Sequence, residues 1–307
     1  MLEFLLKSFG KNLLWITAVL GASAPVVVLL LLDRRDRQRR DELSSPPQEE
    51  KLLRPPGYSL ALKMEKLWDD FTQMLIWIIG SGAIGFLSLF EGFVLFLVPE
   101  MRTLRIAFLI VGIACVVFTV RKTFAARVLL RQRRNCQLGL RGEQAVAESL
   151  SEVASFGYRV FHDLPGGENW NIDHVVVGPQ GVFAIETKAR RRRKVPDLQR
   201  AHVVNYDADK LAFPTFEDHK AIPQARRNAQ WVAEYLTKKT GERVDVAPLV
   251  VLPGWYVVCS VADTRGFAAM NATFLKKYLA KQRAMVPPDQ VRRIITALEE
   301  KCRDIEF

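Results

Sequence analysis

The stretch that decides the fold is residues 171–188, which read NIDHVVVGPQGVFAIETK. Two apolar runs flank Gly178-Pro179-Gln180-Gly181, whose glycines and proline favour a tight turn between two strands. We therefore expect strands at 171–177 and 181–189 that pair with each other as a hairpin.

Three charged residues lie within these apolar strands: Asp173, Glu186 and Lys188. Alternate side chains of a strand point to opposite faces, so Glu186 and Lys188 share one face and the hairpin can bring Asp173 beside them. Carboxylate oxygens are the ligands that Mg²⁺ prefers, and a lysine beside the ion can orient water or stabilise developing charge. We predict a catalytic site for Mg²⁺ or Mn²⁺ here. A structural ion pair between Asp173 and Lys188 is the alternative. His174 directly follows Asp173 and should face the other way.

Outward from the hairpin, the pattern predicts a mixed sheet flanked by helices. Glu143 stands at the head of the first helix and is a candidate third carboxylate of the site. The order is helix, three strands, helix, strand and helices, which is typical of an α/β core. The expected helices are 143–153, 222–239, 271–281 and 288–302, the further strands are 158–164 and 246–252, and the region between Arg190 and Ile222 is expected to be irregular.

This ordered set of motifs resembles a known family. Gly139-Leu140-Arg141-Gly142-Glu143, Asn171-Ile172-Asp173-His174, Ile185-Glu186-Thr187-Lys188 and Pro223-Gln224-Ala225 with Asn228 are similar to the nuclease-related domain (NERD) family, within the PD-(D/E)xK nuclease superfamily. The resemblance covers about 138–252. It implies a restriction-endonuclease-like fold, a metal site made by Asp173, Glu186 and Glu143, a catalytic role for these residues and Lys188, and a role in DNA processing.

A basic run follows the second strand of the hairpin. Because it leaves the predicted site directly, its side chains could hold a phosphate backbone against the metal, although a solvated loop is the more common fate of a charge run. Gln224 and Asn228 lie four residues apart on one helical face, where they contact the site or are merely exposed. The candidate nucleic-acid-binding residues are Arg190, Arg191, Arg192, Arg193, Lys194 and Gln224.

The first part of the chain is strongly apolar and predicts a membrane region over residues 1–122. Helices are expected at about 12–32, 74–98 and 104–120, the first being long enough to cross a hydrocarbon core. A basic cluster stops the first segment at Asp33, Arg34 and Arg35, which favours a retained anchor over a cleaved signal peptide. A basic linker helix is expected at 123–137, followed by the nuclease-related domain with its C-terminal helices at 138–307.

The charge distribution predicts an orientation in the membrane. Basic residues crowd the loop after the first segment and the stretch after the third, whereas the loop between the last two has only Arg102 and Arg105. Since Lys and Arg are retained on the cytoplasmic side, we expect a multi-pass protein of the cell inner membrane with its N-terminus outside and its nuclease-type domain in the cytoplasm. The four scattered cysteines and the net charge of +11 agree with reduced thiols and an anionic partner, either lipid or nucleic acid.

Two functions are compatible with these patterns. The first is a membrane-anchored, metal-dependent enzyme that hydrolyses phosphodiester bonds in nucleic acid, with DNA favoured as the substrate. The second is a non-catalytic module that binds nucleic acid or protein at the membrane. Intact Asp173, Glu186 and Lys188 favour the first, because a binding module has no need to keep all three.

Overall fold

The computed structural model of the chain describes residues 24–36, 38–39, 51–97, 99–167, 170–192, 201–207, 209–259 and 266–305. The chain forms two compact units. One comprises Met1–Ser45 with Met64–Arg134, and the other comprises Pro46–Lys63 with Asn135–Phe307.

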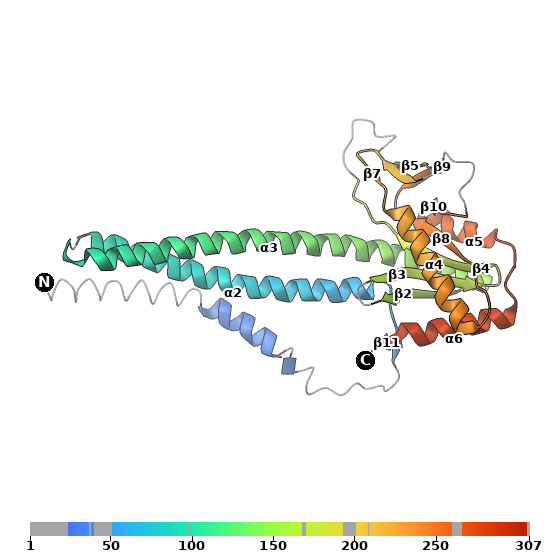
Figure 1. The fold of residues 1–307 in the computed structure, drawn as a ribbon, viewed down its shortest axis with the longest axis horizontal. Coiled ribbons are helices and arrows are strands. Elements are labelled where there is room, and N and C mark those ends of the chain that lie inside the picture. The colour runs from blue at the N-terminus through green and yellow to red at the C-terminus, as the bar shows by residue number, and fades with distance from the viewer. Residues whose placement is uncertain are drawn as a thin grey trace. The chain divides into compact units, whose positions relative to one another are not determined.

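The first unit contains a helical hairpin. Helix α2 (Tyr58–Val94) and helix α3 (Arg102–Ser151) lie side by side and are joined by two short 3-10 turns, η1 (Leu95–Leu97) and η2 (Pro99–Met101) (Figure 1). Small residues allow the helices to approach closely, as between Gly85 and Cys115. The hydroxyls of Ser81 and Thr119 are 2.7 Å apart and link the two helices through a hydrogen bond.

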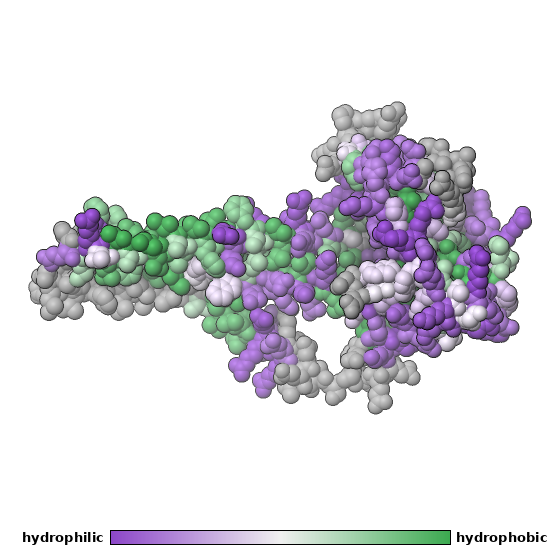
Figure 2. Space-filling view, viewed as in Figure 1, coloured by the Kyte–Doolittle hydropathy of each residue, from purple (hydrophilic) through white to green (hydrophobic). Residues whose placement is uncertain are grey.

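Helices α2 and α3 are long and apolar enough to cross a membrane. Their most apolar stretches are exposed, with only 11% and 6% of those residues buried, and Figure 2 shows the hydrophobic surface that results. The sequence predicts three such helices, but the described residues contain two. Most of the predicted first segment, 12–32, lies outside the described residues, which begin at Ala24 and are helical over 24–36.

The second unit is built on a five-stranded mixed sheet, as the sequence predicts. Its strands lie in the order β10 (Ala268–Met270), β8 (Val246–Val251), β4 (Gly181–Thr187), β3 (Trp170–Gly178) and β2 (Arg159–Gly167). The predicted hairpin is confirmed, because β3 and β4 pair antiparallel and close at Gly178 and Gly181. Strand β2 is antiparallel to β3, whereas β8 is parallel to β4 and to β10.

Helices cover both faces of this sheet (Figure 1). Val175 and Val177 point toward helices α4 (Ala221–Thr240) and α6 (Pro288–Cys302) and form one core. Val176 points the other way, toward the end of α3, η3 (Glu152–Phe156), η4 (Ala272–Phe274) and α5 (Leu275–Ala280). The helix expected at 271–281 is shorter in the structure, where the 3-10 turn η4 leads into the six-residue helix α5.

The region between Arg190 and Ile222, expected to be irregular, contains strands. β5 (Val203–Asp207), β6 (Lys210–Phe213) and β7 (Phe216–Asp218) join β9 (Tyr256–Cys259) in a second sheet of order β7-β6-β5-β9. These strands have three to five residues, too few for a clear alternating pattern. Apolar residues of this sheet pack against the start of α4 and against Trp255 and Phe267.

Residues well before the predicted domain boundary at 138 complete the second unit. Strand β1 (Leu52–Leu53) pairs antiparallel with the C-terminal strand β11 (Arg303–Ile305). Arg54 and Ser59 then contact Asp163, which is fully buried in β2. The compact unit consequently includes residues 46–63 as well as 135–307. Helix α3 is continuous over Arg102–Ser151 and therefore belongs to both units.

Candidate metal centre

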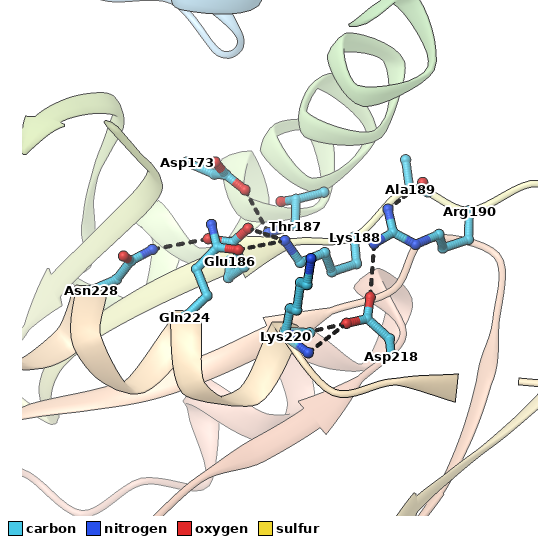
Figure 3. A network of polar contacts seen from close by, with 11 residues as sticks. Asp173, Glu186, Thr187, Lys188, Ala189, Arg190, Asp218, Lys220, Gln224 and Asn228 are labelled. Carbon is cyan, nitrogen blue, oxygen red and sulfur yellow. Dashed lines mark hydrogen bonds and ion pairs between the residues drawn. The ribbon is translucent and has the colours of Figure 1, made fainter. Parts of the chain in front are cut away.

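Asp173, Glu186 and Lys188 lie near one end of the main sheet, on the face that α4 covers (Figure 3). Asp173 alternates with Val175 along β3, and Glu186 alternates with Ala184 along β4, so both carboxylates point to the α4 side. Both are buried, with 9% and 3% of their surface exposed. The sequence-based expectation that these side chains share a face agrees with this arrangement.

A hydrogen-bond network fixes these groups. The Lys188 ammonium donates to Glu186 Oε1 at 2.6 Å and to Gln224 Oε1 at 2.9 Å, and Asn228 Nδ2 donates to Glu186 Oε2 at 2.9 Å. The backbone N–H of Thr187 donates to Asp173 Oδ2 at 2.6 Å. Gln224 and Asn228 lie on one face of α4 (Figure 3). This helix therefore supplies a hydrogen-bond partner to Lys188 and another to Glu186.

Glu143 reaches the same region from helix α3. Its neighbour Gly142 lies against the strand end, where an added Cβ would be 2.5 Å from the Cβ of Ala189. Only glycine lets the helix pass so close to the strand. The Glu143 carboxyl is 5% exposed, and its Oε2 is buried with no hydrogen-bond partner. An unsatisfied buried acceptor is costly and marks a place where a ligand can be accommodated.

Each of the three carboxyls has a raised pKa, and for two of them the charges of other carboxyls contribute. Burial, followed by the charges of Asp163 and Glu186, raises the pKa of Glu143 to about 8. Burial, followed by the charges of Glu186 and Glu143, raises the pKa of Asp173 well above its usual value. Burial also raises the pKa of Glu186, against the opposing effect of Lys188. Neighbouring carboxylates in a buried site repel each other and gain from a positive charge between them.

The described residues do not contain three His, Cys, Asp or Glu side chains already converged for a metal ion. Lys188 and Asn228 instead donate to the two oxygens of Glu186, and the Lys188 ammonium supplies a positive charge beside that carboxylate. The donor set nevertheless fits a hard divalent cation, since it consists of carboxylate oxygens and includes the unpartnered Oε2 of Glu143.

The basic run divides into residues with different surroundings. Arg190 donates to Asp218 Oδ2 at 2.8 Å, and Asp218 Oδ1 accepts the N–H groups of Lys220 and Ala221 at the start of α4. Arg190 thus helps to hold the helix that carries Gln224. Arg191 and Arg192 are exposed, whereas the predicted contacts Arg193 and Lys194 lie outside the described residues.

Sequence reasoning missed the role of Asp163. Its Oδ1 accepts from Asn171 Nδ2 at 2.6 Å and from the Ser59 N–H at 3.2 Å, and its Oδ2 accepts from Ser59 Oγ at 2.6 Å and Arg54 Nη1 at 3.0 Å. The signal available in the sequence was an acidic residue within an apolar strand. His174 points away from the metal-site face, as expected, and its Nδ1 lies 2.8 Å from His162 Nδ1.

Comparison with known families agrees with this geometry. Residues 138–253 match the family model described as nuclease-related domain (NERD). This segment is a nuclease-related domain. The match begins in α3, ends just after β8 and contains Glu143, Asp173, Glu186, Lys188 and the partners from α4. No curated protein and no solved structure matches the chain.

Proposed function

We propose that the chain is a membrane-anchored, metal-dependent nuclease that hydrolyses phosphodiester bonds in nucleic acid, with DNA as its substrate. The observation that carries this proposal is the buried group of Glu143, Asp173 and Glu186 beside Lys188, within the nuclease-related domain. We infer that the mixed sheet with helices on both faces is restriction-endonuclease-like. Apart from the second sheet inserted between β4 and α4, the order of helix α3, antiparallel strands β2, β3 and β4, helix α4 and parallel strand β8 supports this inference.

Asp173, Glu186 and Glu143 would hold Mg²⁺ or Mn²⁺ through their carboxylate oxygens. A divalent cation bound there supplies the positive charge that neutralises phosphate and lowers the pKa of bound water. The unpartnered Oε2 of Glu143 and the like charges of the buried carboxyls support this assignment. The cation would compete with the Lys188 ammonium for Glu186, since Lys188 donates to that carboxylate.

Lys188 has the second role in the proposed site. Its ammonium is held between Glu186 and Gln224 and is only 13% exposed, so its position is fixed by neighbours rather than by solvent. A fixed ammonium beside the reacting phosphate can orient the attacking water and stabilise the charge that develops on the phosphate oxygens. Gln224 is then a positioning residue, since it accepts a hydrogen bond from Lys188.

Basic side chains next to the site would bind the phosphate backbone. Arg191 and Arg192 are exposed immediately after the strand end that carries Lys188. Phosphate contacts of this type fix the register of a nucleic acid without reading its sequence. We extend the same role to Arg190, Arg193 and Lys194, with Arg190 dividing its interactions between the nucleic acid and Asp218.

Helices α2 and α3 would anchor this domain to a membrane. Their exposed apolar stretches support the proposal, and we infer that residues 12–32 add a third crossing. The distribution of basic residues supports our inference that the protein lies in the cell inner membrane with the nuclease-type domain in the cytoplasm. A reporter enzyme fused after Phe307 should be active only on the cytoplasmic side, and activity on the other side would contradict this orientation.

Cleavage by the full chain in detergent micelles tests the enzymatic proposal. Linear, circular and single-stranded DNA, and RNA, are incubated with Mg²⁺, Mn²⁺ or a chelator. We expect cleavage that requires the metal and falls at least about 100-fold in Lys188→Ala, because electrostatic stabilisation of this kind is worth about 10²–10³ in rate. Lys281→Ala removes an exposed lysine elsewhere and should cleave like the wild type.

A non-catalytic binding module is the competing function. It is favoured by the pairing of Lys188 with Glu186, which balances the charge of that carboxylate without a metal. If the wild type binds DNA but cuts no substrate with either metal, and Lys188→Ala binds as tightly, the enzyme proposal fails and the binding module replaces it.

A further inference from the structure

A groove lies beside the candidate metal centre, between the start of β3 and the exposed side of α4. It has a volume of about 450 Å³ and is lined by Trp170, Gln224, Arg227, Asn228, Trp231 and Glu234, together with Asn171 and Gln230. This volume is within the range of about 300–1,000 Å³ that is usual for small-ligand sites. Every lining residue belongs to the second unit.

Aromatic rings form part of the wall of the groove. The Trp170 ring meets Trp231 edge to face, with centroids 5.4 Å apart at 79°, and Trp231 stacks on Tyr235 at 5.4 Å and 3°. Trp170 remains 41% exposed. Two aromatic rings, Trp170 and Trp231, therefore line the groove, and Tyr235 stacks on the second of them.

Glycines of β2 fix the position of Trp170. A Cβ at Gly166 would lie 2.4 Å from the Trp170 ring, and one at Gly167 would lie 2.8 Å from its Nε1. The indole thus packs directly on the backbone of these two glycines, where a side chain would collide with the ring. An exposed aromatic ring that is already held in place loses little conformational entropy when a ligand stacks on it.

The groove is continuous with the candidate metal centre through α4. Gln224 and Asn228 line the groove and also contact Lys188 and Glu186, respectively. A ligand in the groove therefore lies next to the carboxylates. The groove and the candidate centre thus share two side chains, Gln224 and Asn228.

The charges of the groove favour a base over a phosphate. The lining carries one arginine, Arg227, and one glutamate, Glu234, so it has no net charge, and the Oε1 of Glu234 accepts a hydrogen bond from Gln230 at 2.9 Å. A phosphate would be repelled by the carboxylate, whereas a flat neutral ring can stack on Trp170 and meet the amide groups of the groove. We propose that this groove holds an unpaired nucleobase of the strand that is cut, an inference that rests on the proposed nuclease function.

The consequence is a preference for substrates with unpaired bases. A base inside a duplex must be unstacked and unpaired before it can enter a pocket, which costs a few kcal/mol, whereas a single strand or a frayed end pays much less. Single-stranded DNA and duplexes with single-stranded ends should therefore bind more tightly and be cut faster than blunt duplexes of the same sequence.

Binding of a fluorescent single-stranded oligonucleotide and of its blunt duplex tests this proposal. The full chain in detergent is used, with Ca²⁺ replacing Mg²⁺ to suppress cleavage. We expect tighter binding of the single strand and a loss of about 5- to 150-fold in Trp170→Ala, since stacking of one base on an aromatic ring is worth about 1–3 kcal/mol. Trp170→Phe should retain most of the affinity, and Phe274→Ala removes a ring of similar exposure elsewhere as a control.

Equal affinity of the wild type for single strand and blunt duplex would overturn the base-binding groove, whatever the stability of the Trp170 variants. So would an effect of Trp170→Ala that is equal for the two ligands. In both cases the nuclease proposal still stands if cleavage requires metal and Lys188. If instead no nucleic acid is cut but Trp170→Ala still weakens the single strand selectively, the groove binds an unpaired base of a strand that is not cut, and the nuclease proposal fails.

Discussion

Two buried carboxyls in the second unit, Asp163 and Glu143, have opposite surroundings. Asp163 is 0% exposed, and its two oxygens accept hydrogen bonds from Arg54, Ser59 and Asn171. Glu143 is 5% exposed, yet its Oε2 has no partner. Both carboxyls have a raised pKa because of burial, so burial alone does not separate them.

We propose that this difference separates a structural carboxylate, Asp163, from a metal-binding carboxylate, Glu143. Asp163 is satisfied by the protein itself and fastens Arg54 and the first turn of α2, through Ser59, to β2. Glu143 lies among other carboxyls, and its Oε2 has no hydrogen-bond partner, although a contact with the Gly57 backbone lowers the pKa of the carboxyl against the larger effect of burial. A protein retains such an arrangement at a cost in stability. Variants at these positions should therefore affect different properties, stability for Asp163 and metal binding for Glu143.

The largest expected effect is on stability, in Asp163→Ala. Removing one partner of a buried ion pair leaves the other groups unsatisfied and costs about 3–5 kcal/mol. We expect a much lower midpoint of thermal unfolding for the full chain in detergent. Asp304→Ala removes the other carboxylate that pairs with Arg54, but this group is 39% exposed and its loss should cost at most about 1 kcal/mol. Equal midpoints for the two variants would contradict the anchoring role of Asp163.

An intermediate effect is expected on the pH dependence of stability without metal. The pKa of Glu143 is about 8 in the fold and 4.5 for an ordinary glutamate. Its protonation therefore contributes stability that is fully present below pH 4.5 and is lost as pH rises through about 8.

Glu143→Gln removes this contribution, so its thermal midpoint in chelator should fall less between about pH 5 and pH 9 than that of the wild type. Part of the decrease should remain, because the pKa of Asp173 and of Glu186 is also raised. Asp304→Asn serves as the control and should follow the wild type. Parallel curves for Glu143→Gln and the wild type would mean that Glu143 is not protonated in the metal-free fold.

The smallest effect is expected for the exposed arginines after β4. Removing one arginine that binds a phosphate should flatten the log–log dependence of DNA affinity on salt by about one unit. The double variant Arg191→Ser/Arg192→Ser should therefore bind DNA more weakly at low salt with a smaller slope, while metal affinity and stability are unchanged. Lys281→Ser/Arg283→Ser is the matched control. An unchanged slope in the first variant would mean that these arginines are solvated and do not contact the phosphates of DNA.

The sequence predicts the hairpin because its determinants are local. Apolar runs on either side of Gly178 and Gly181 specify two strands and their turn, and the two-residue period then places Glu186 and Lys188 on one face. The sequence predicts the long helices α4 and α6 within one residue at each end for the same reason, since helical periodicity over fifteen or more residues is a strong pattern.

Interactions between distant residues are not predictable in this way. Arg54 and Asp163 are 109 positions apart, and nothing in the spacing of either residue indicates the other. The short strands of the second sheet are too brief to show a period. The sequence places Asn228 on the same helical face as Gln224, but its bond to Glu186 depends on how α4 packs over the sheet.

Binding of Mn²⁺, followed by electron paramagnetic resonance of the full chain in detergent, tests the central claim most directly. We expect one tightly bound ion per chain at about pH 8, with affinity that increases with pH because the carboxyls must lose protons. Asp173→Asn and Glu143→Gln should each weaken binding at least about tenfold, since each removes a charged ligand, and Asp304→Asn should bind like the wild type. Absence of a bound ion in the wild type, or equal affinity in all three variants, would contradict the assignment of Glu143, Asp173 and Glu186 as a metal site.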